Sequence, residues 1–566
     1  MVRECLKCRE SFSISSKQLS LLERLSPKFS DPTANALKIP PPTLCPDCRK
    51  QRRLLFRNER VLYHRSCDLT SQRMLSIYPA SVPFPVYEHS VWWGESWDPL
   101  HFGAPYDLSR SFFEQFAELR NRVPRINLYV DDRCENSKFC NQITMCKSCY
   151  LLFSASSSED CYYGYRVNNS RNCLDCLMTN SSELCYDCVE SFSCYSCRHS
   201  QKISQCTDCA FVYDCRNCKS CMFCYGLRNK EYCLFNEQLT KSEYQSRLAA
   251  LRLDTLTGVN SARATFAAFC QRFPRRFATL RNVEDVTGDN IENAKSCVSV
   301  FDGENLEDVS YCQFFQDGKD CSDINFGCDR VELAYEVSTT GIDAREIAFC
   351  IDVWPVVSNL FYCDSCSNGT KYCFGCVGLR KQEYCILNRQ YTAEQYHELL
   401  PKIVASMQSF GEWGEFFPGW LSPHGYNETV AMQYFPLSRE AATASGYNWQ
   451  KIEVHTYNPQ SYIVPDSIRE VADDLLQAVL ACSSCAKNFK VIPHELEFYR
   501  KNSIPLPTTC SDCRQDERAG RRNPPKLFSR LCSECGSPIE TTFAPSGSER
   551  ASSERVCCEA CYLKLL

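Results

Sequence analysis

Cysteines near the two ends of the chain stand in pairs whose spacing suits metal binding. Each pair has the form C-x-x-C, and two such knuckles can supply four thiolates to one tetrahedral zinc ion. The sequence therefore predicts about three Zn²⁺ per chain, and the predicted ligands are Cys5, Cys8, Cys45 and Cys48; Cys482, Cys485, Cys510 and Cys513; and Cys532, Cys535, Cys558 and Cys561.

The middle of the chain carries a second set of cysteines, most regular between Cys173 and Cys233. Their spacing repeats every 21 residues, as in Cys173, Cys194 and Cys215, and the residues between them favour short strands and turns. This pattern predicts a coiled β-solenoid whose rungs stack roughly 4.8 Å apart. The pattern alone leaves three uses open: a ladder of reduced thiols that act as small buried hydrophobes, zinc sites, or an iron–sulfur cluster. It favours the ladder.

Each outer pair of knuckles is followed by a stripe of arginines. The stripe is Arg49, Arg53 and Arg57 near the start and Arg514, Arg518 and Arg522 near the end, each at i, i+4 and i+8. On a helix these residues share one face, and guanidinium groups pair well with phosphate or carboxylate. We therefore predict that the six arginines bind nucleic acid, such as ribosomal RNA. The alternative is that they pair with acidic residues of the protein itself.

Charge and composition limit the class of protein. The chain has 566 residues, 43 cysteines and a net charge of −5, yet residues 1–65 and 479–566 are both basic. The first ten residues contain no apolar core of a secretory signal, and no run of 18 apolar residues is present. We therefore expect a cytoplasmic protein with reduced thiols and no membrane contact.

A further ribbon without metal is predicted at residues 61–98. The step from Cys48 to Cys67 equals the step from Cys513 to Cys532. In that alignment Thr70, Glu88 and Val91 stand where three ligands should be. The aromatic side chains of this segment are expected to form a core in place of the ion.

The body of the chain shows signs of an internal duplication. The stretch CYGLRNKEYC (224–233) has a near copy, CVGLRKQEYC (376–385), and each is followed by a threonine, Thr240 or Thr392, that could cap a helix. We predict a mainly β protein with a duplicated Cys-rich solenoid flanked by small ribbons. Its expected parts are ribbons at 1–60 and 61–98, a helical connector at 99–130, solenoids at 131–238 and 283–390, helical segments at 239–282 and 391–478, and ribbons at 479–524 and 525–566.

The end modules resemble a probable zinc-ribbon domain of the trcl type, with CAKNF and ELEFYRK in matching order within 482–514. The order of parts over nearly the whole chain resembles a group of uncharacterised Cys-rich proteins with many CxxC pairs from ultra-small candidate-phyla bacteria. Members sometimes carry the label CaiB/BaiF, which implies a CoA-transferase with an aspartate nucleophile. No motif in this chain supports that activity, so the resemblance implies an architecture rather than a reaction.

Two classes of function follow from these features. The first is a non-enzymatic zinc-binding scaffold that binds nucleic acid or a protein through its ends. The alternative is a thiol-redox, metal-handling or sulfur-handling protein that uses the central CxxC pairs. The sequence contains no GxSxG, HExxH or P-loop motif, identifies no catalytic residue and indicates no small-molecule substrate.

Overall fold

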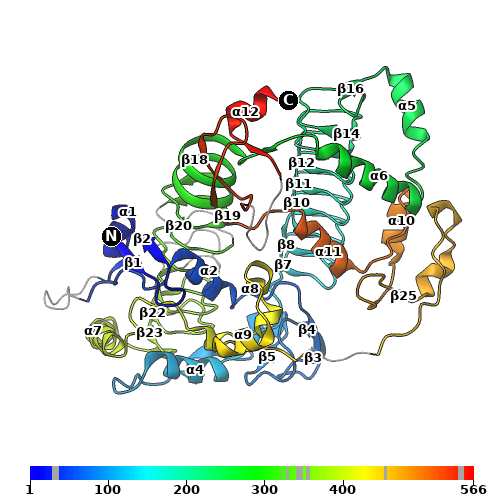
Figure 1. Cartoon of the computed structure of the whole chain (residues 1–566). Coiled ribbons are helices and arrows are strands. Elements are labelled where there is room, and N and C mark those ends of the chain that lie inside the picture. The colour runs from blue at the N-terminus through cyan, green and yellow to red at the C-terminus, as the bar shows by residue number, and fades with distance from the viewer. Residues whose placement is uncertain are drawn as a thin grey trace.

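Two β-solenoids form the body of the molecule, and both ends of the chain fold against them (Figure 1). The structure is a computed structural model that describes residues 1–27, 37–319, 321–326, 331–338, 348–351, 357–451, 456–545 and 554–565. A mainly β fold built on a solenoid, with few helices and Cys-rich clusters near both termini, is confirmed.

The first solenoid is a single ten-stranded sheet. Its strands run parallel except for the last, which turns back in an antiparallel hairpin. They are β7 (Asn141–Thr144), β8 (Phe153–Ser156), β9 (Tyr165–Asn168), β10 (Leu177–Asn180), β11 (Val189–Phe192), β12 (Gln201–Ser204), β13 (Ala210–Tyr213), β14 (Met222–Tyr225), β15 (Cys233–Leu234) and β16 (Glu237–Gln238).

One turn of this solenoid takes 12 residues, because Leu177 pairs with Tyr165 on one side and with Val189 on the other. The 21-residue spacing of the cysteines therefore does not correspond to one turn of the solenoid. Every third residue has a left-handed backbone (Asp175, φ 55°; Met178, φ 55°), so inward positions recur every three residues. Every cysteine from Cys134 to Cys233 lies in that register. Because 12 and 21 are both multiples of three, cysteines spaced 21 residues apart all occupy inward positions. Their spacing therefore does not reveal the length of the turn.

The inward positions form four columns, and between residues 134 and 221 two of them hold only Cys or Ser. One column contains Cys149, Cys161, Cys173, Cys185, Cys197, Cys209, Cys221 and Cys233, and its neighbour contains Cys134, Cys146, Ser158, Ser170, Ser182, Cys194, Cys206 and Cys218.

These side chains make hydrogen bonds as well as filling space. The Cys197 Sγ lies 3.5 Å from the Tyr195 carbonyl oxygen and 3.4 Å from that of Cys206 on the next turn. The Ser158 hydroxyl makes the equivalent bonds at 3.1 and 2.9 Å. The thiols thus act as donors that join successive turns, which adds to their expected role as small apolar groups.

The second solenoid consists of two sheets with a similar coil. Its strands are β18 (Leu280–Glu307), β19 (Gln313–Lys319), β20 (Val331–Glu332), β21 (Ser358–Phe361), β22 (Lys371–Phe374), β23 (Glu383–Ile386) and β24 (Arg389–Gln390). The pairing of Phe301 with Gln313 gives a 12-residue turn, and that of Ser358 with Lys371 gives a 13-residue turn. Its interior mixes cysteines with Ile, Val and Leu.

Both solenoids end in the same way. The hairpins β15–β16 and β23–β24 are each followed by a helix, α5 (Lys241–Ala249) or α7 (Ala393–Ser409). The predicted N-caps are confirmed, because the hydroxyl groups of Thr240 and Thr392 each accept a hydrogen bond from the third residue of the helix.

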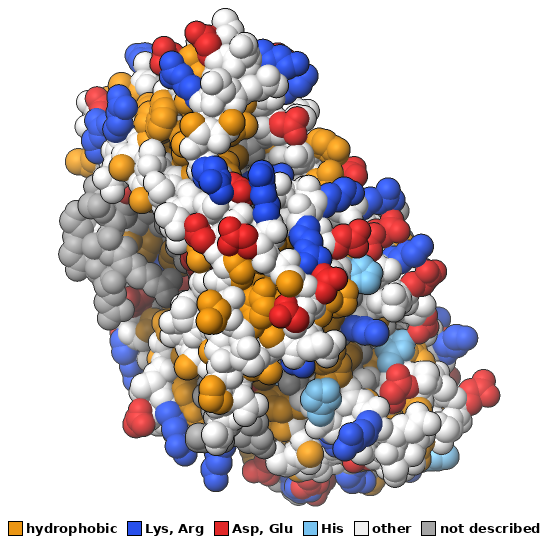
Figure 2. Space-filling model, turned by 90° about the vertical axis from the view of Figure 1, so that its right-hand side faces the viewer, with side chains coloured by type: hydrophobic (Ala, Val, Ile, Leu, Met, Phe, Trp, Pro, Cys, Tyr) orange, Lys and Arg blue, Asp and Glu red, His pale blue; other side chains and the backbone are white. Residues whose placement is uncertain are grey.

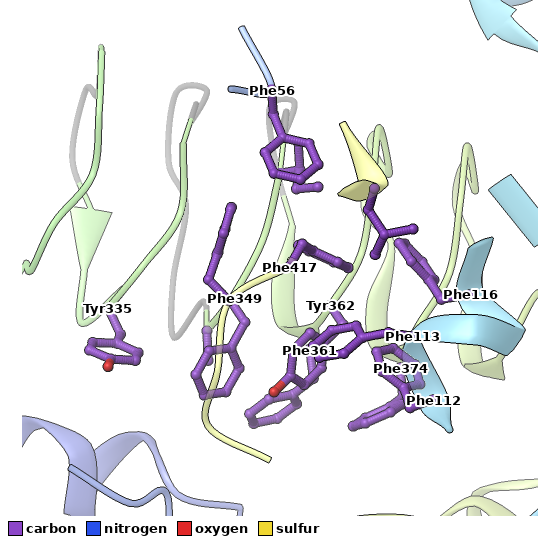
Figure 3. Close-up of a cluster of buried hydrophobic side chains, with 14 of the residues drawn as sticks. Phe56, Phe112, Phe113, Phe116, Tyr335, Phe349, Phe361, Tyr362, Phe374 and Phe417 are labelled. Atoms are coloured by element: carbon purple, nitrogen blue, oxygen red, sulfur yellow. The ribbon is translucent and has the colours of Figure 1, made fainter. Parts of the chain in front are cut away.

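Aromatic side chains cover one face of the second solenoid. In Figure 3, Phe112, Phe113 and Phe116 of α4 (Phe112–Arg122) lie against solenoid rings. The Phe112 ring centroid is 5.0 Å from that of Tyr362 and 5.4 Å from that of Phe374. The other helices of the body are α3 (His89–Trp93), η2 (Pro99–Phe102), α6 (Leu256–Cys270), η3 (Gly419–Leu421), η4 (Tyr426–Glu428), α8 (Val430–Tyr434), α9 (Arg439–Ala444), η5 (Ile468–Glu470) and η6 (Asp473–Gln477).

The ribbons are small units of a hairpin and one or two helices. They contain β1 (Val2–Glu4), β2 (Ser11–Ser13), α1 (Ser16–Leu25) and α2 (Pro46–Leu54); β3 (Tyr63–Ser66), β4 (Arg73–Ser76), β5 (Val86–Tyr87) and β6 (Arg125–Ile126); β25 (Leu480–Ala481), β26 (Asn488–Phe489), α10 (Pro493–Lys501) and α11 (Ser511–Gly520); and β27 (Phe528–Leu531), β28 (Pro538–Thr541), β29 (Val556–Cys557) and α12 (Glu559–Lys564). Strand β17 (Arg275–Arg276) pairs with β29. Within the described ranges, no helix combines the length and apolar character needed to cross a bilayer.

Candidate metal centres

The structure brings the cysteines of the terminal knuckles together in three groups of four. They are Cys5, Cys8, Cys45 and Cys48; Cys482, Cys485, Cys510 and Cys513; and Cys532, Cys535, Cys558 and Cys561, and within each group all four sulfur atoms lie within 4.8 Å of one another. A tetrahedron of roughly 2.3 Å zinc–sulfur bonds has edges of roughly 3.8 Å.

Sulfur pairs across the knuckles match that edge length. The distance is 3.6 Å from Cys8 to Cys45, 3.7 Å from Cys485 to Cys510 and 3.8 Å from Cys535 to Cys558. Each group is therefore shaped to hold one metal ion.

The elements around each group fix the four sulfur atoms. The first knuckle is the turn of a hairpin, and the second begins a helix, with Cys45, Cys510 and Cys558 as the N-caps of α2, α11 and α12. Backbone N–H groups point at the sulfur atoms, as in the bond from Cys45 N to Cys5 Sγ at 3.2 Å. Burial raises the pKa of Cys482 and Cys532, but these backbone donors outweigh it and lower each pKa to about 6. The thiolate form that binds metal is thereby favoured.

The solenoid cysteines that the structure describes do not form such groups. In the part of the chain that the structure describes, only the three terminal groups bring His, Cys, Asp or Glu side chains close enough together to hold a metal ion. The solenoid thiols instead contact backbone carbonyl oxygens, as Cys209 Sγ does at 3.3 and 3.6 Å. Their geometry agrees with the thiol ladder.

Residues 63–93 have the backbone of a ribbon without its ligands. Cys67 N donates to Gln72 O at 2.9 Å, and Glu88 N donates to Cys67 Sγ at 3.4 Å. The last ribbon has the same bonds, from Cys532 N to Ser537 O at 2.8 Å and from Cys558 N to Cys532 Sγ at 3.3 Å. Glu88 caps α3 as Cys558 caps α12.

The core of this fourth unit is apolar. Cys67, Met74, Ile77, Tyr78, Phe84 and Val86 form a buried cluster. The Tyr78 ring packs edge-on against Phe84, with 5.1 Å between centroids. Side-chain packing thus stabilises a fold that the other three units would stabilise with an ion.

A fourth metal ion is expected to bind when Thr70, Glu88 and Val91 are all replaced by Cys. The backbone already places these residues where Cys535, Cys558 and Cys561 stand in the last ribbon. Metal analysis of the purified variant should find one more ion per chain than in the parent. The variant Thr70→Cys alone is the matched control and should bind no additional ion. An unchanged metal content in the triple variant would contradict the equivalence of the two backbones.

The first arginine stripe faces the second solenoid. The Arg49 Nε donates to the Asp323 carboxylate at 2.9 Å, and Arg53 Nη2 lies 3.2 Å from the same carboxylate. Arg53 Nη1 also lies 3.4 Å from Glu336. All four side chains are at most 2% exposed. Helix α2 ends at Leu54, so Arg57 lies beyond it and pairs with Glu59 at 2.5 Å.

The second stripe makes the same arrangement on the first solenoid. The Arg514 Nε donates to Asp175 at 3.0 Å, and Arg518 Nη1 lies 2.9 Å from that carboxylate. In both stripes the first arginine also donates to a carbonyl oxygen just before the knuckle, Leu44 O at 2.7 Å and Thr509 O at 2.8 Å.

Arg522 joins the two solenoids. It lies beyond the end of α11 and bridges Glu190 of the first solenoid, at 2.9 Å, and Asp302 of the second, at 2.5 Å. Burial raises the pKa of Glu190, but the Arg522 guanidinium and the cation of Lys202 outweigh it, so that this pKa is lowered to about 2.

The structure places the six arginines that were predicted to contact nucleic acid against groups of the protein itself; they are Arg49, Arg53, Arg57, Arg514, Arg518 and Arg522. The six side chains are buried or nearly so and are held by carboxylates or amides of the protein itself. A buried charge demands a partner, and the acidic solenoids provide it. The internal pairing that the sequence left as the alternative is what the structure contains.

Sequence reasoning missed the carboxylates that receive these arginines. Asp175 and Asp323 are separated from their partners by 339 and 274 residues. Both stand at outward, left-handed positions of a rung, with φ of 55° and 39°. These positions can be recognised in the sequence only once the 12-residue turn is known.

A scan against protein-family models finds no match to the chain, and a search of curated proteins finds none either.

Proposed function

We propose that the protein is a non-enzymatic zinc-binding scaffold. Three ions stabilise the folded terminal ribbons, and the ribbons hold the two solenoids together. The observation that supports this most directly is the convergence of four sulfur atoms within 4.8 Å in each of three separate ribbons. Structural zinc sites are four-coordinate and rich in thiolate, and ligand pairs of the form C-x-x-C are typical of them.

The thiolate set favours zinc over other ions. Hard cations such as Mg²⁺ and Ca²⁺ prefer oxygen ligands, which none of the three groups provides. A tetrahedral S₄ site suits zinc or iron. Elemental analysis separates these two metals directly.

The scaffold role follows from what the ribbons touch. In each of the two outer ribbons, the second knuckle lies at the start of the helix that carries the first two arginines of the stripe. The metal site therefore positions that helix. Those arginines neutralise buried carboxylates of the solenoids. The face in Figure 2 shows basic and acidic side chains interspersed, which gives no support to a nucleic-acid surface there.

The proposal is tested by metal analysis of the full-length protein, purified without added metal. We expect close to three zinc ions per chain, and close to two for the variant Cys485→Ser, which loses a ligand of the second group. A protein without zinc would overturn the proposal. Six or more ions per chain would place metal on the solenoid thiols and favour the metal-handling alternative.

A further inference from the structure

The third metal group, at Cys532, Cys535, Cys558 and Cys561, is the most open to solvent. Only Cys532 is buried, Cys558 and Cys561 are half-buried, and Cys535 is exposed. In the first group, by contrast, three of the four thiols are buried and one is exposed. Oxidants reach thiolates according to their exposure, so the third group is the most accessible of the three.

The ribbon around this group contacts both solenoids. On the first solenoid, the Tyr562 hydroxyl donates to Asp214 at 2.5 Å. On the second, the Thr542 hydroxyl lies 3.4 Å from Asp289.

Its strand β29 also pairs in parallel with β17, which lies between α6 and β18 in the chain. The Phe277 N–H donates to Cys557 O at 3.0 Å, and Arg275 pairs with Glu554 at 2.7 Å. This ribbon therefore holds the connection between the two solenoids.

The four thiols join the two parts of the ribbon. Cys532 and Cys535 belong to the turn between β27 and β28, whereas Cys558 and Cys561 lie at the start of α12. The two parts have in common a small apolar cluster that includes Ile539, Phe543 and Tyr562. The hairpin is also joined to the segment that pairs with β17 by hydrogen bonds between Ser533 and Val556 at 2.9 and 3.1 Å, and loss of the ion would leave the two parts with these weaker links.

We propose that the group at Cys532, Cys535, Cys558 and Cys561 is a redox-sensitive clasp that opens when a peroxide oxidises it. The inference rests on the proposed metal binding. The Cys535 thiolate attacks the peroxide, its O–O bond breaks, and a sulfenic acid and one hydroxide form. The Cys558 thiolate then attacks the sulfenic sulfur, which forms the disulfide and expels a second hydroxide. Both hydroxides take up protons to give water.

The geometry suits this pair. The sulfur atoms of Cys535 and Cys558 lie 3.8 Å apart and come from the two parts of the ribbon. Two electrons pass from sulfur to oxygen, and the ion loses two of its four ligands. It is then released, and β29 separates from β17.

The test exposes the full-length, metal-loaded protein to hydrogen peroxide. Metal release is followed with a chelating dye, disulfides by mass spectrometry, and backbone protection by hydrogen exchange. We expect the first ion released to accompany a Cys535–Cys558 disulfide and faster exchange at residues 275–277. Amides of the first solenoid should keep their protection, because its turns do not depend on the ion.

The matched variant is Cys535→His, which keeps a metal ligand but removes the attacking sulfur. It should retain its third ion under the same peroxide treatment. Equal release from all three groups, unchanged exchange at 275–277 after release, or release from Cys535→His as fast as from the parent would each overturn the clasp. If the purified protein holds no metal before oxidation, the proposed function itself fails, and that result is distinct from the others.

Discussion

Replacing Asp323 by Asn is expected to lower the free energy of unfolding by about 3–5 kcal/mol. The Asp323 carboxylate lies between Arg49 and Arg53, and all three side chains are at most 2% exposed. The amide keeps the shape of the side chain but leaves the two cations with less compensating charge in a buried site. Chemical denaturation followed by circular dichroism measures the change.

The matched control for this variant is Glu398→Ala on α7. Glu398 pairs with Lys402 at 2.8 Å, but both side chains are more than half exposed. Water screens such a pair, so its removal should leave the denaturation midpoint nearly unchanged. An equally small effect for Asp323→Asn would show that the first ribbon does not depend on this contact.

The variant Cys197→Val should lose about 1–3 kcal/mol of stability, since it combines overpacking with the loss of a donor. Cys197 is fully buried, and its thiol contacts carbonyl oxygens of two successive turns. The variant Cys197→Ser should stay within about 1 kcal/mol of the parent, because a hydroxyl donates to the same oxygens. Thermal or chemical denaturation of both variants gives the comparison.

The informative result is which of the two variants, Cys197→Val or Cys197→Ser, is the more stable. Serine already fills equivalent inward positions at Ser158, Ser170 and Ser182. A valine variant more stable than the serine variant would mean that the thiols act only as apolar groups. It would also remove the explanation for the two columns that hold only Cys and Ser between residues 134 and 221.

Local spacing made the ribbons predictable. A C-x-x-C knuckle needs only four residues, and a second knuckle within a few tens of residues completes the site, so the sequence alone indicated which thiols converge. The same reasoning predicted a fourth ribbon at 61–98, with Thr70, Glu88 and Val91 at ligand positions, and the backbone of residues 63–93 has the matching hydrogen bonds.

The turn length of the solenoid was not predictable in the same way. Inward positions recur every three residues, so the cysteine pattern is compatible with any turn whose length is a multiple of three. The backbone pairing of Leu177 with Val189 selects 12. The sequence also did not show which groups the arginine stripes contact, because their partners Asp175 and Asp323 lie hundreds of residues away in the chain.

Each of these two terminal ribbons packs on the solenoid that is farther from it in the sequence, and this has a consequence for the nascent chain. The N-terminal ribbon rests on the second solenoid, and the ribbon at 482–513 rests on the first. A nascent chain made in order therefore exposes Arg49 and Arg53 until Asp323 has left the ribosome, and leaves Asp175 unneutralised until Arg514 follows. These ribbon contacts on both solenoids can therefore form only late in translation.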